Sequence, residues 1–388
     1  MSENITPQQY RAELSNMNHE VAQLKAQVIE SQTIDKYNPF DNPTEYHHYN
    51  DDYSKISPEI NEIGYKIPLS PPRSEKRGIK HYYNIAGLCL VLSEILTILL
   101  FYALTYIISG VLLFANRSAN IEAVETYMKS TSIYMGINML IFMLANVGLA
   151  WFGLKIAKIK TSELFKTTSF TFTRAFQYIF IALMLQTFAA YISSGITYFF
   201  EQCGYSPLSP DNSIGFSTYT GKIMSIVYGC LVAPITEEFF YRGMLLKLFS
   251  KANQRFGIFF TAFLFGIAHG NIAQFSLGFI VGIFLAHITL KHNSIIPAII
   301  CHIAVNTKSE VLNIIYKSFD SGYFISAIIT VAAALFGLIM FFEFRLKNKL
   351  PATTPAQTRR GFSLTCTCVP IIIVITYQLF NMLLSITA

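Results

Sequence analysis

Apolar segments separated by short polar loops recur along the chain after residue 80. A helix of about 20 apolar residues is long enough to cross the hydrocarbon core of a bilayer. Nearly uncharged stretches lie at 84–114, 131–154, 177–200, 223–235, 256–269, 272–290, 294–307, 323–342 and 364–388. This pattern predicts an all-α fold, a polytopic transmembrane bundle of eight or nine helices over residues 81–388.

The fifth of these stretches is short. Residues 256–269 span only about 20 Å as a helix, which is less than the thickness of the bilayer. Either this helix begins outside the hydrocarbon, near Lys251, or the fifth and sixth helices form a shallow hairpin. A hairpin buried in protein would be able to line a water-filled cavity.

The first 80 residues are polar and form a separate tail. In 1–37, apolar residues recur at alternating spacings of four and three, which predicts a short coiled coil for self-association or an amphipathic helix on the membrane or on the protein itself. Residues 38–80 are rich in Pro, Asp, Asn, Tyr and Ser and are expected to be a disordered linker. The tail lacks the apolar segment of a secretory signal, so it is expected to stay in the cytoplasm.

Composition and charge agree with a membrane protein. Hydrophobic residues make up 52% of the chain and charged residues 13%, and the mean hydropathy is +0.42. Short cytoplasmic loops of membrane proteins are enriched in Lys and Arg. Basic residues gather in alternate loops, at 73–80, 155–174, 247–255, 291 and 345–360. We therefore expect a multi-pass protein of the cell (plasma) membrane with a cytoplasmic N-terminus, and the net charge of +6 gives no indication of a nucleic-acid partner.

The six cysteines are dispersed and show no CxxC spacing, so they predict neither a structural zinc site nor a disulfide framework. The sequence also lacks the His-Glu-x-x-His motif of zinc metalloproteases and the Gly-x-Ser-x-Gly motif of serine hydrolases. The chemistry that remains available inside the apolar segments is that of glutamate, histidine and asparagine.

Charge is concentrated at the end of the fourth apolar stretch. Two carboxylates and an arginine there are costly at membrane depth and indicate a functional site. Glu238 and Arg242 are four residues apart, so they can pair on one helix face, whereas Glu237 is turned about 100° away and is free to act as a base. His302 and Asn306 are one turn apart, so both can point at a developing oxyanion.

Three motifs carry a family resemblance. They are Glu237-Glu238-Phe-Phe-Tyr-Arg242, Phe-Gly-Ile-Ala-His269 and His302-Ile-Ala-Val-Asn306, in this order and each in an apolar segment. Together they resemble the motifs of the CPBP family, which comprises the type II CAAX prenyl endopeptidases and the Abi bacteriocin-processing membrane proteases. The resemblance covers about 220–310 and leaves the tail and the outer helices unexplained.

The resemblance implies an intramembrane endopeptidase that cuts a membrane-associated or prenylated protein near the cytoplasmic face of the bilayer. Glu237 and His269 would activate a water molecule, Glu238 and Arg242 would orient and polarise that pair, and His302 and Asn306 would stabilise the oxyanion. Members of the family are commonly called metalloproteases. Glu237, His269 and His302 are therefore candidate ligands of a divalent metal such as zinc, although a glutamate–histidine water mechanism without metal uses the same residues.

Two other functions fit the same residues. The protein would be a non-catalytic CPBP-like bacteriocin-immunity or scaffold protein if the cavity only binds a partner. A proton-coupled transporter would also place Glu and His inside the membrane. Replacement of Glu237 distinguishes these functions, because only the protease would lose peptide cleavage.

Overall fold

The computed structural model describes residues 75–116, 120–166, 170–207, 218–347 and 361–387, together with a few isolated positions before residue 66. The chain divides into two units, 1–72 and 73–388. Most of the predicted tail helix and most of the predicted linker lie outside the described residues; the tail positions that are described, 16, 20, 21 and 23, are helical. The first unit contributes the antiparallel pair β1 (Ile60–Asn61) and β2 (Gly64–Tyr65).

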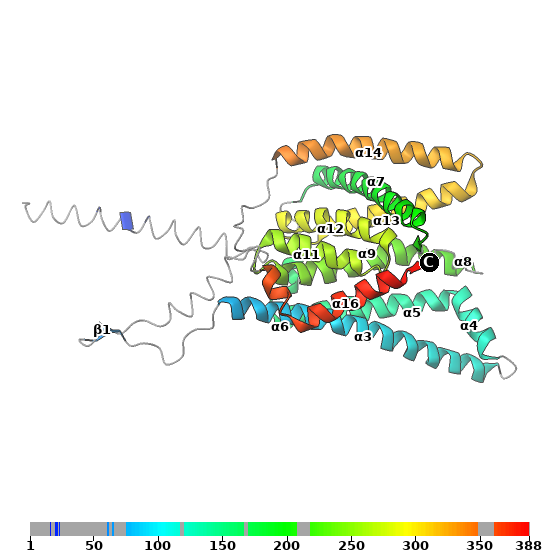
Figure 1. Cartoon of the computed structure of the whole chain (residues 1–388), viewed down its shortest axis with the longest axis horizontal. Helices are drawn as coiled ribbons and strands as arrows, with labels where there is room; N and C mark the ends of the chain where they lie inside the picture. The colour runs from blue at the N-terminus through cyan, green and yellow to red at the C-terminus, as the bar shows by residue number, and fades with distance from the viewer. Residues whose placement is uncertain are drawn as a thin grey trace, which may run out of the picture. The chain divides into compact units, whose positions relative to one another are not determined.

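The second unit is helical, as the apolar pattern predicts (Figure 1). Its described residues include seven helical stretches that are long and apolar enough to cross a membrane, and two shorter apolar helices. The α-helices before the candidate site are α3 (Glu75–Ala115), α4 (Ile121–Ser130), α5 (Ser132–Phe142), α6 (Leu149–Ile156) and α7 (Phe172–Gln202). Those that follow are α8 (Tyr219–Val227), α9 (Ala233–Glu238), α10 (Leu246–Phe249), α11 (Gln254–Ile267), α12 (Ile272–His292), α13 (Ile296–Ser318), α14 (Gly322–Lys347) and α16 (Val369–Leu384).

Three predicted boundaries were wrong. Helix α3 begins at Glu75, inside the predicted linker. The fourth stretch continues to Phe249, because the two glutamates and the arginine lie within the helix and not at its end. The apolar stretch at 294–307 is only the first part of α13, which continues to Ser318 and includes Lys308. In each case charged residues ended the apolar run but not the helix.

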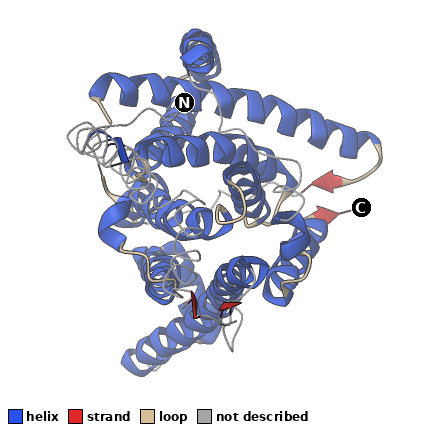
Figure 2. Cartoon of the chain, turned by 90° about the vertical axis from the view of Figure 1, so that its left-hand side faces the viewer, coloured by secondary structure: helices blue, strands red, loops and turns tan. Residues whose placement is uncertain are grey.

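The long helices run alternately in opposite directions. Figure 1 shows that α3 and α7 begin, and α6 and α14 end, at the same end of the bundle. The same view shows α3 beside α16 and α7 beside α14, and both pairs are in contact. The two-residue strands β3 (Ser206–Pro207) and β4 (Ile386–Thr387) pair next to the C-terminus (Figure 2).

Helices α11 and α12 form a tight hairpin. Asn253 and Asn271 cap the two helices by accepting hydrogen bonds from backbone N–H groups of the first turn. Helix α11 starts at Gln254, three residues after Lys251, and is too short to cross a bilayer, whereas α12 is long enough to do so. Gly278 and Gly282, one turn apart on α12, allow the close approach: a Cβ on Gly278 would lie 3.0 Å from the Cα of Gly266.

The stretch from Tyr219 to Phe249 contains two π-helical segments, η3 (Tyr228–Val232) and η4 (Phe239–Leu245), on either side of α9. In η3 the N–H of Ala233 bonds to the carbonyl of Tyr228, five residues earlier. The next residue, Pro234, has no N–H, so the carbonyl of Gly229 loses both of its backbone donors. π-Helical turns occur frequently at functional sites, and these two flank the adjacent glutamates.

Candidate functional site

Glu238 and Arg242 form the buried centre of the site. Arg242 Nη1 donates a hydrogen bond of 2.8 Å to Glu238 Oε1, and the two side chains are 1% and 0% exposed. The guanidinium also lies 4.4 Å from the centre of the Phe265 ring and donates to the carbonyl of Gly282 at 3.4 Å. The predicted pair is therefore confirmed. Its burial is possible because the arginine neutralises the carboxylate.

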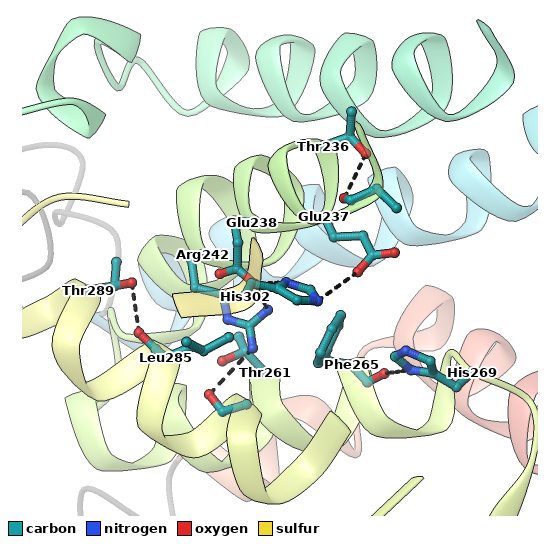
Figure 3. Close-up of polar contacts among 12 residues, drawn as sticks. Thr236, Glu237, Glu238, Arg242, Thr261, Phe265, His269, Leu285, Thr289 and His302 are labelled. Carbon is teal, nitrogen blue, oxygen red and sulfur yellow. Dashed lines mark hydrogen bonds and ion pairs between the residues drawn. The ribbon is translucent and has the colours of Figure 1, made fainter. Parts of the chain in front are cut away.

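His302 lies between the two glutamates (Figure 3). Its Nδ1 is 2.8 Å from Glu238 Oε1, and its Nε2 is 3.8 Å from Glu237 Oε2. Because a carboxylate only accepts hydrogen bonds, the Glu238 contact places a proton on Nδ1 and fixes the orientation of the ring. The ring edge of His302 also packs on Phe265, with the ring centres 5.7 Å apart. The other nitrogen of the imidazole thus faces Glu237.

Glu237 differs from its neighbour in accessibility. Its side chain is 19% exposed, whereas that of Glu238 is fully buried. The 3.8 Å approach to His302 is longer than a hydrogen bond. Glu237 therefore has a carboxylate that is held near an imidazole and remains open to a water molecule or a substrate.

His269 approaches the site from the tip of the α11–α12 hairpin. Its Nδ1 lies 2.8 Å from the carbonyl of Phe265, and the two rings meet edge to face at 5.0 Å. Figure 3 shows Phe265 between His269 and His302. Because a carbonyl only accepts hydrogen bonds, this contact places a proton on Nδ1 of His269. Its Nε2 is then the unprotonated ring nitrogen of this half-buried histidine.

Asn306 does not point with His302 at one common atom. Its Nδ2 donates a 2.8 Å hydrogen bond to the carbonyl of Gly229 in η3. This is the carbonyl that Pro234 leaves without a backbone donor. The contact shows that Asn306 ties α13 to the site helix, and the second N–H of its amide is left for other partners.

A metal does not fit the residues as they are arranged. In the described part of the chain, no group of three or more His, Cys, Asp or Glu side chains is placed to hold an ion. The candidate ligands Glu237, His269 and His302 all belong to this described part and form no such group. The cation that neutralises the Glu238 carboxylate is the Arg242 guanidinium, with its Nη1 2.8 Å from Glu238 Oε1.

Sequence reasoning missed several residues that shape the site. Phe265 contacts Arg242, His269 and His302, but an aromatic residue in an apolar helix gives no specific signal. A Cβ on Gly282 would lie 3.2 Å from Arg242 Nη2. The Gly-x-x-x-Gly spacing of Gly278 and Gly282 was the signal that would have identified this close packing.

The arrangement suits acid–base chemistry. An open carboxylate and two histidines with defined free nitrogens surround one aromatic side chain, and a buried ion pair fixes one of the histidines. Groups of this kind can remove a proton from water and donate hydrogen bonds to an oxyanion. Glu237 and His302 lie on helices, and His269 lies in the short turn between α11 and α12, so helix packing sets the positions of the first two and the hairpin that of the third.

The comparisons with known proteins agree with this description. Residues 219–307 match the family model of Rce1-like type II CAAX prenyl endopeptidases, and the match contains all six predicted site residues. The predicted resemblance is thus confirmed for this segment, which is similar to a CAAX-type intramembrane protease. No curated protein and no solved structure matches the chain.

Proposed function

We propose that the protein is an intramembrane endopeptidase that hydrolyses a peptide bond near the C-terminus of a prenylated, membrane-bound protein. One observation carries this proposal: the open carboxylate of Glu237 faces His302, whose other nitrogen is bonded to the buried Glu238–Arg242 pair. The match of this segment to the CAAX endopeptidase family supports the choice of substrate. The basic loops favour a cytoplasmic N-terminus and a cut on the cytoplasmic side of the cell membrane.

The reaction begins with water held between Glu237 and the free Nε2 of His269. Glu237 takes a proton from the water, and the oxygen attacks the carbonyl carbon of the scissile bond. The developing oxyanion accepts a hydrogen bond from a protonated Nε2 of His302. Glu237 then returns the proton to the leaving amine, so that the C–N bond breaks and the charges balance.

Glu238 and Arg242 act on this reaction through His302. The carboxylate keeps the imidazole oriented by its bond to Nδ1 and stabilises the ring when it carries a positive charge. Arg242 prevents Glu238 from becoming an uncompensated charge in the bundle. Neither residue needs to touch the substrate.

The test is cleavage of a farnesylated CAAX peptide by the purified full chain in lipid vesicles, carried out in ¹⁸O-water. We expect one ¹⁸O atom in the new carboxyl group, identified by mass spectrometry, and no change of rate with a metal chelator, because no metal takes part in the proposed steps. A folded protein that releases no product would favour the non-catalytic immunity or scaffold function. A chelator that abolishes cleavage would show that the mechanism is wrong although the activity is right.

A further inference from the structure

A second polar cluster bridges α7 and α13, and none of its members was among the predicted site residues. We call it the α7–α13 cluster; it consists of Gln186 and Thr187 on α7 and Lys308 and Ser309 on α13. Lys308 Nζ donates to the Thr187 hydroxyl at 3.2 Å. Gln186 Nε2 donates to the Ser309 hydroxyl at 2.7 Å and to the carbonyl of Val305 at 3.1 Å.

Lys308 is the unusual member of the cluster. It lies inside a helix that is long and apolar enough to span the membrane, where an ionisable side chain is expensive. Arg242 meets the same cost with a carboxylate at 2.8 Å. For Lys308, the described part of the chain offers only a neutral hydroxyl and no carboxylate partner. The positive charge of Lys308 is therefore available to an anion supplied by a ligand.

A second group in the cluster also lacks a partner. Gln186 is 7% exposed, and its Oε1 is buried without a hydrogen bond among the described residues. A buried amide oxygen without a donor costs about 1–3 kcal/mol. The cluster thus combines an ammonium group without an anion and an acceptor without a donor. A peptide C-terminus offers the complementary pair, a carboxylate and the N–H of the last residue.

The cluster is placed at a suitable distance from the reacting groups. Ser309 lies seven residues after His302, which is about 10 Å along α13 and within about 20° of the same helix face. Both Ser309 and Lys308 contact α7, and Ser309 is exposed whereas Lys308 is half-buried. A CAAX box has three residues after the prenylated cysteine, and three extended residues also cover about 10 Å.

We infer that the α7–α13 cluster binds the C-terminal carboxylate of the substrate, with the Lys308 ammonium as the donor and Gln186 Oε1 as the acceptor of the terminal N–H. This inference rests on the proposed function, since it assumes a substrate with a free C-terminus held at the Glu237 site. The distance between the cluster and the reacting groups then selects substrates with three residues after the scissile bond. Gln186 lies outside the family match at 219–307 and Lys308 and Ser309 just beyond its end, so the match assigns no role to them.

The inference is tested by binding and not by turnover. The probe is a fluorescent farnesylated CAAX peptide with a free carboxylate, compared with the same peptide ending in an amide. Both are titrated against the full chain carrying Glu237→Gln in vesicles, so that the peptide stays intact. We expect the acid to bind at least about tenfold more tightly than the amide, because the amide leaves Lys308 without its anion.

Lys308→Met should remove this preference by weakening the acid to the level of the amide. Lys308→Arg keeps the positive charge and should retain it. Lys317→Met is the matched control, because Lys317 is an exposed residue in the last turn of the same helix. Equal binding of acid and amide, binding of neither peptide, or a preference that survives Lys308→Met would overturn the inference.

This design separates the two proposals. If the wild-type chain cleaves no peptide but still prefers the acid through Lys308, the protease proposal fails and the carboxylate site remains. If cleavage is observed and the acid preference is absent, the protease proposal stands and the carboxylate site is rejected.

Discussion

Arg242 and Lys308 are both cations inside membrane-spanning helices, but their surroundings differ. Arg242 is 1% exposed, is bonded to Glu238 and packs on Phe265. Lys308 is half-buried and donates to a neutral hydroxyl. The first cation is paired with a carboxylate of the chain itself. The second is compensated only when something else binds.

This difference indicates that Arg242 stabilises the fold, whereas Lys308 binds a ligand. A buried pair such as Glu238–Arg242 adds little net stability, yet loss of one partner leaves a charge stranded in the bundle. A cation with a neutral partner leaves no stranded charge when it is removed. Stability measurements should therefore respond strongly to the first residue, and ligand binding to the second.

The largest effect is expected from Arg242→Met. Removal of the guanidinium leaves Glu238 buried and unpaired, so the free energy of unfolding should fall by about 3–5 kcal/mol. Chemical unfolding in detergent measures this change. The matched variant is Lys308→Met, which should alter stability by no more than about 1 kcal/mol, since it removes a cation without orphaning an anion.

Equal losses of unfolding free energy in Arg242→Met and Lys308→Met would contradict the comparison. The double variant Glu238→Gln, Arg242→Met sharpens it, because removal of both charges should recover part of the loss of the single arginine variant. A double variant that shows the sum of the two single effects would mean that the pair is not coupled.

A smaller effect is expected from Asn306→Ala. The carbonyl of Gly229 then loses the only hydrogen bond found for it in the described residues, which should cost about 1–3 kcal/mol. Pro234→Ala restores an N–H five residues after Gly229, within the register of the π-helical segment. In that background Asn306→Ala should cost less, and an unchanged cost would show that the amide does not serve this carbonyl.

A comparable or smaller effect is expected from Gly278→Ala. The new Cβ would lie 3.0 Å from the Cα of Gly266, so the α11–α12 hairpin must open, at a cost of about 1–3 kcal/mol. His269 would move with the tip, and peptide cleavage should slow. Gly195→Ala is the control, because nothing lies within 4 Å of its added Cβ and alanine favours a helix. Equal melting temperatures for the two variants would disprove tight packing at Gly278.

The fold was largely predictable, since apolar runs report membrane helices directly. The errors at Glu238 and Lys308 have a common physical cause. A charge ends an apolar run in the sequence, but a helix continues through it when another helix supplies a partner, as His302 of α13 does for Glu238 and Thr187 of α7 does for Lys308. Partners across helices are not visible in the order of residues.

The site was predictable to the extent that its contacts are local. The spacing of four between Glu238 and Arg242 predicted their pair, and the structure contains it. The bond between Glu238 and His302 joins residues 64 positions apart, so the sequence motifs named both residues but not their contact. The expectation that His302 and Asn306 point together overlooked the carbonyl left free by Pro234, which takes the asparagine instead.

The most direct test of the account is the activity of Glu237→Gln, measured together with its melting temperature. Because Glu237 is open and has no close hydrogen bond, the amide should fold like the wild type. Its turnover of a farnesylated CAAX peptide should fall by about 10²–10⁴-fold through loss of the general base. A variant that melts at the wild-type temperature and cleaves the peptide at the wild-type rate would contradict the central claim that Glu237 activates the water.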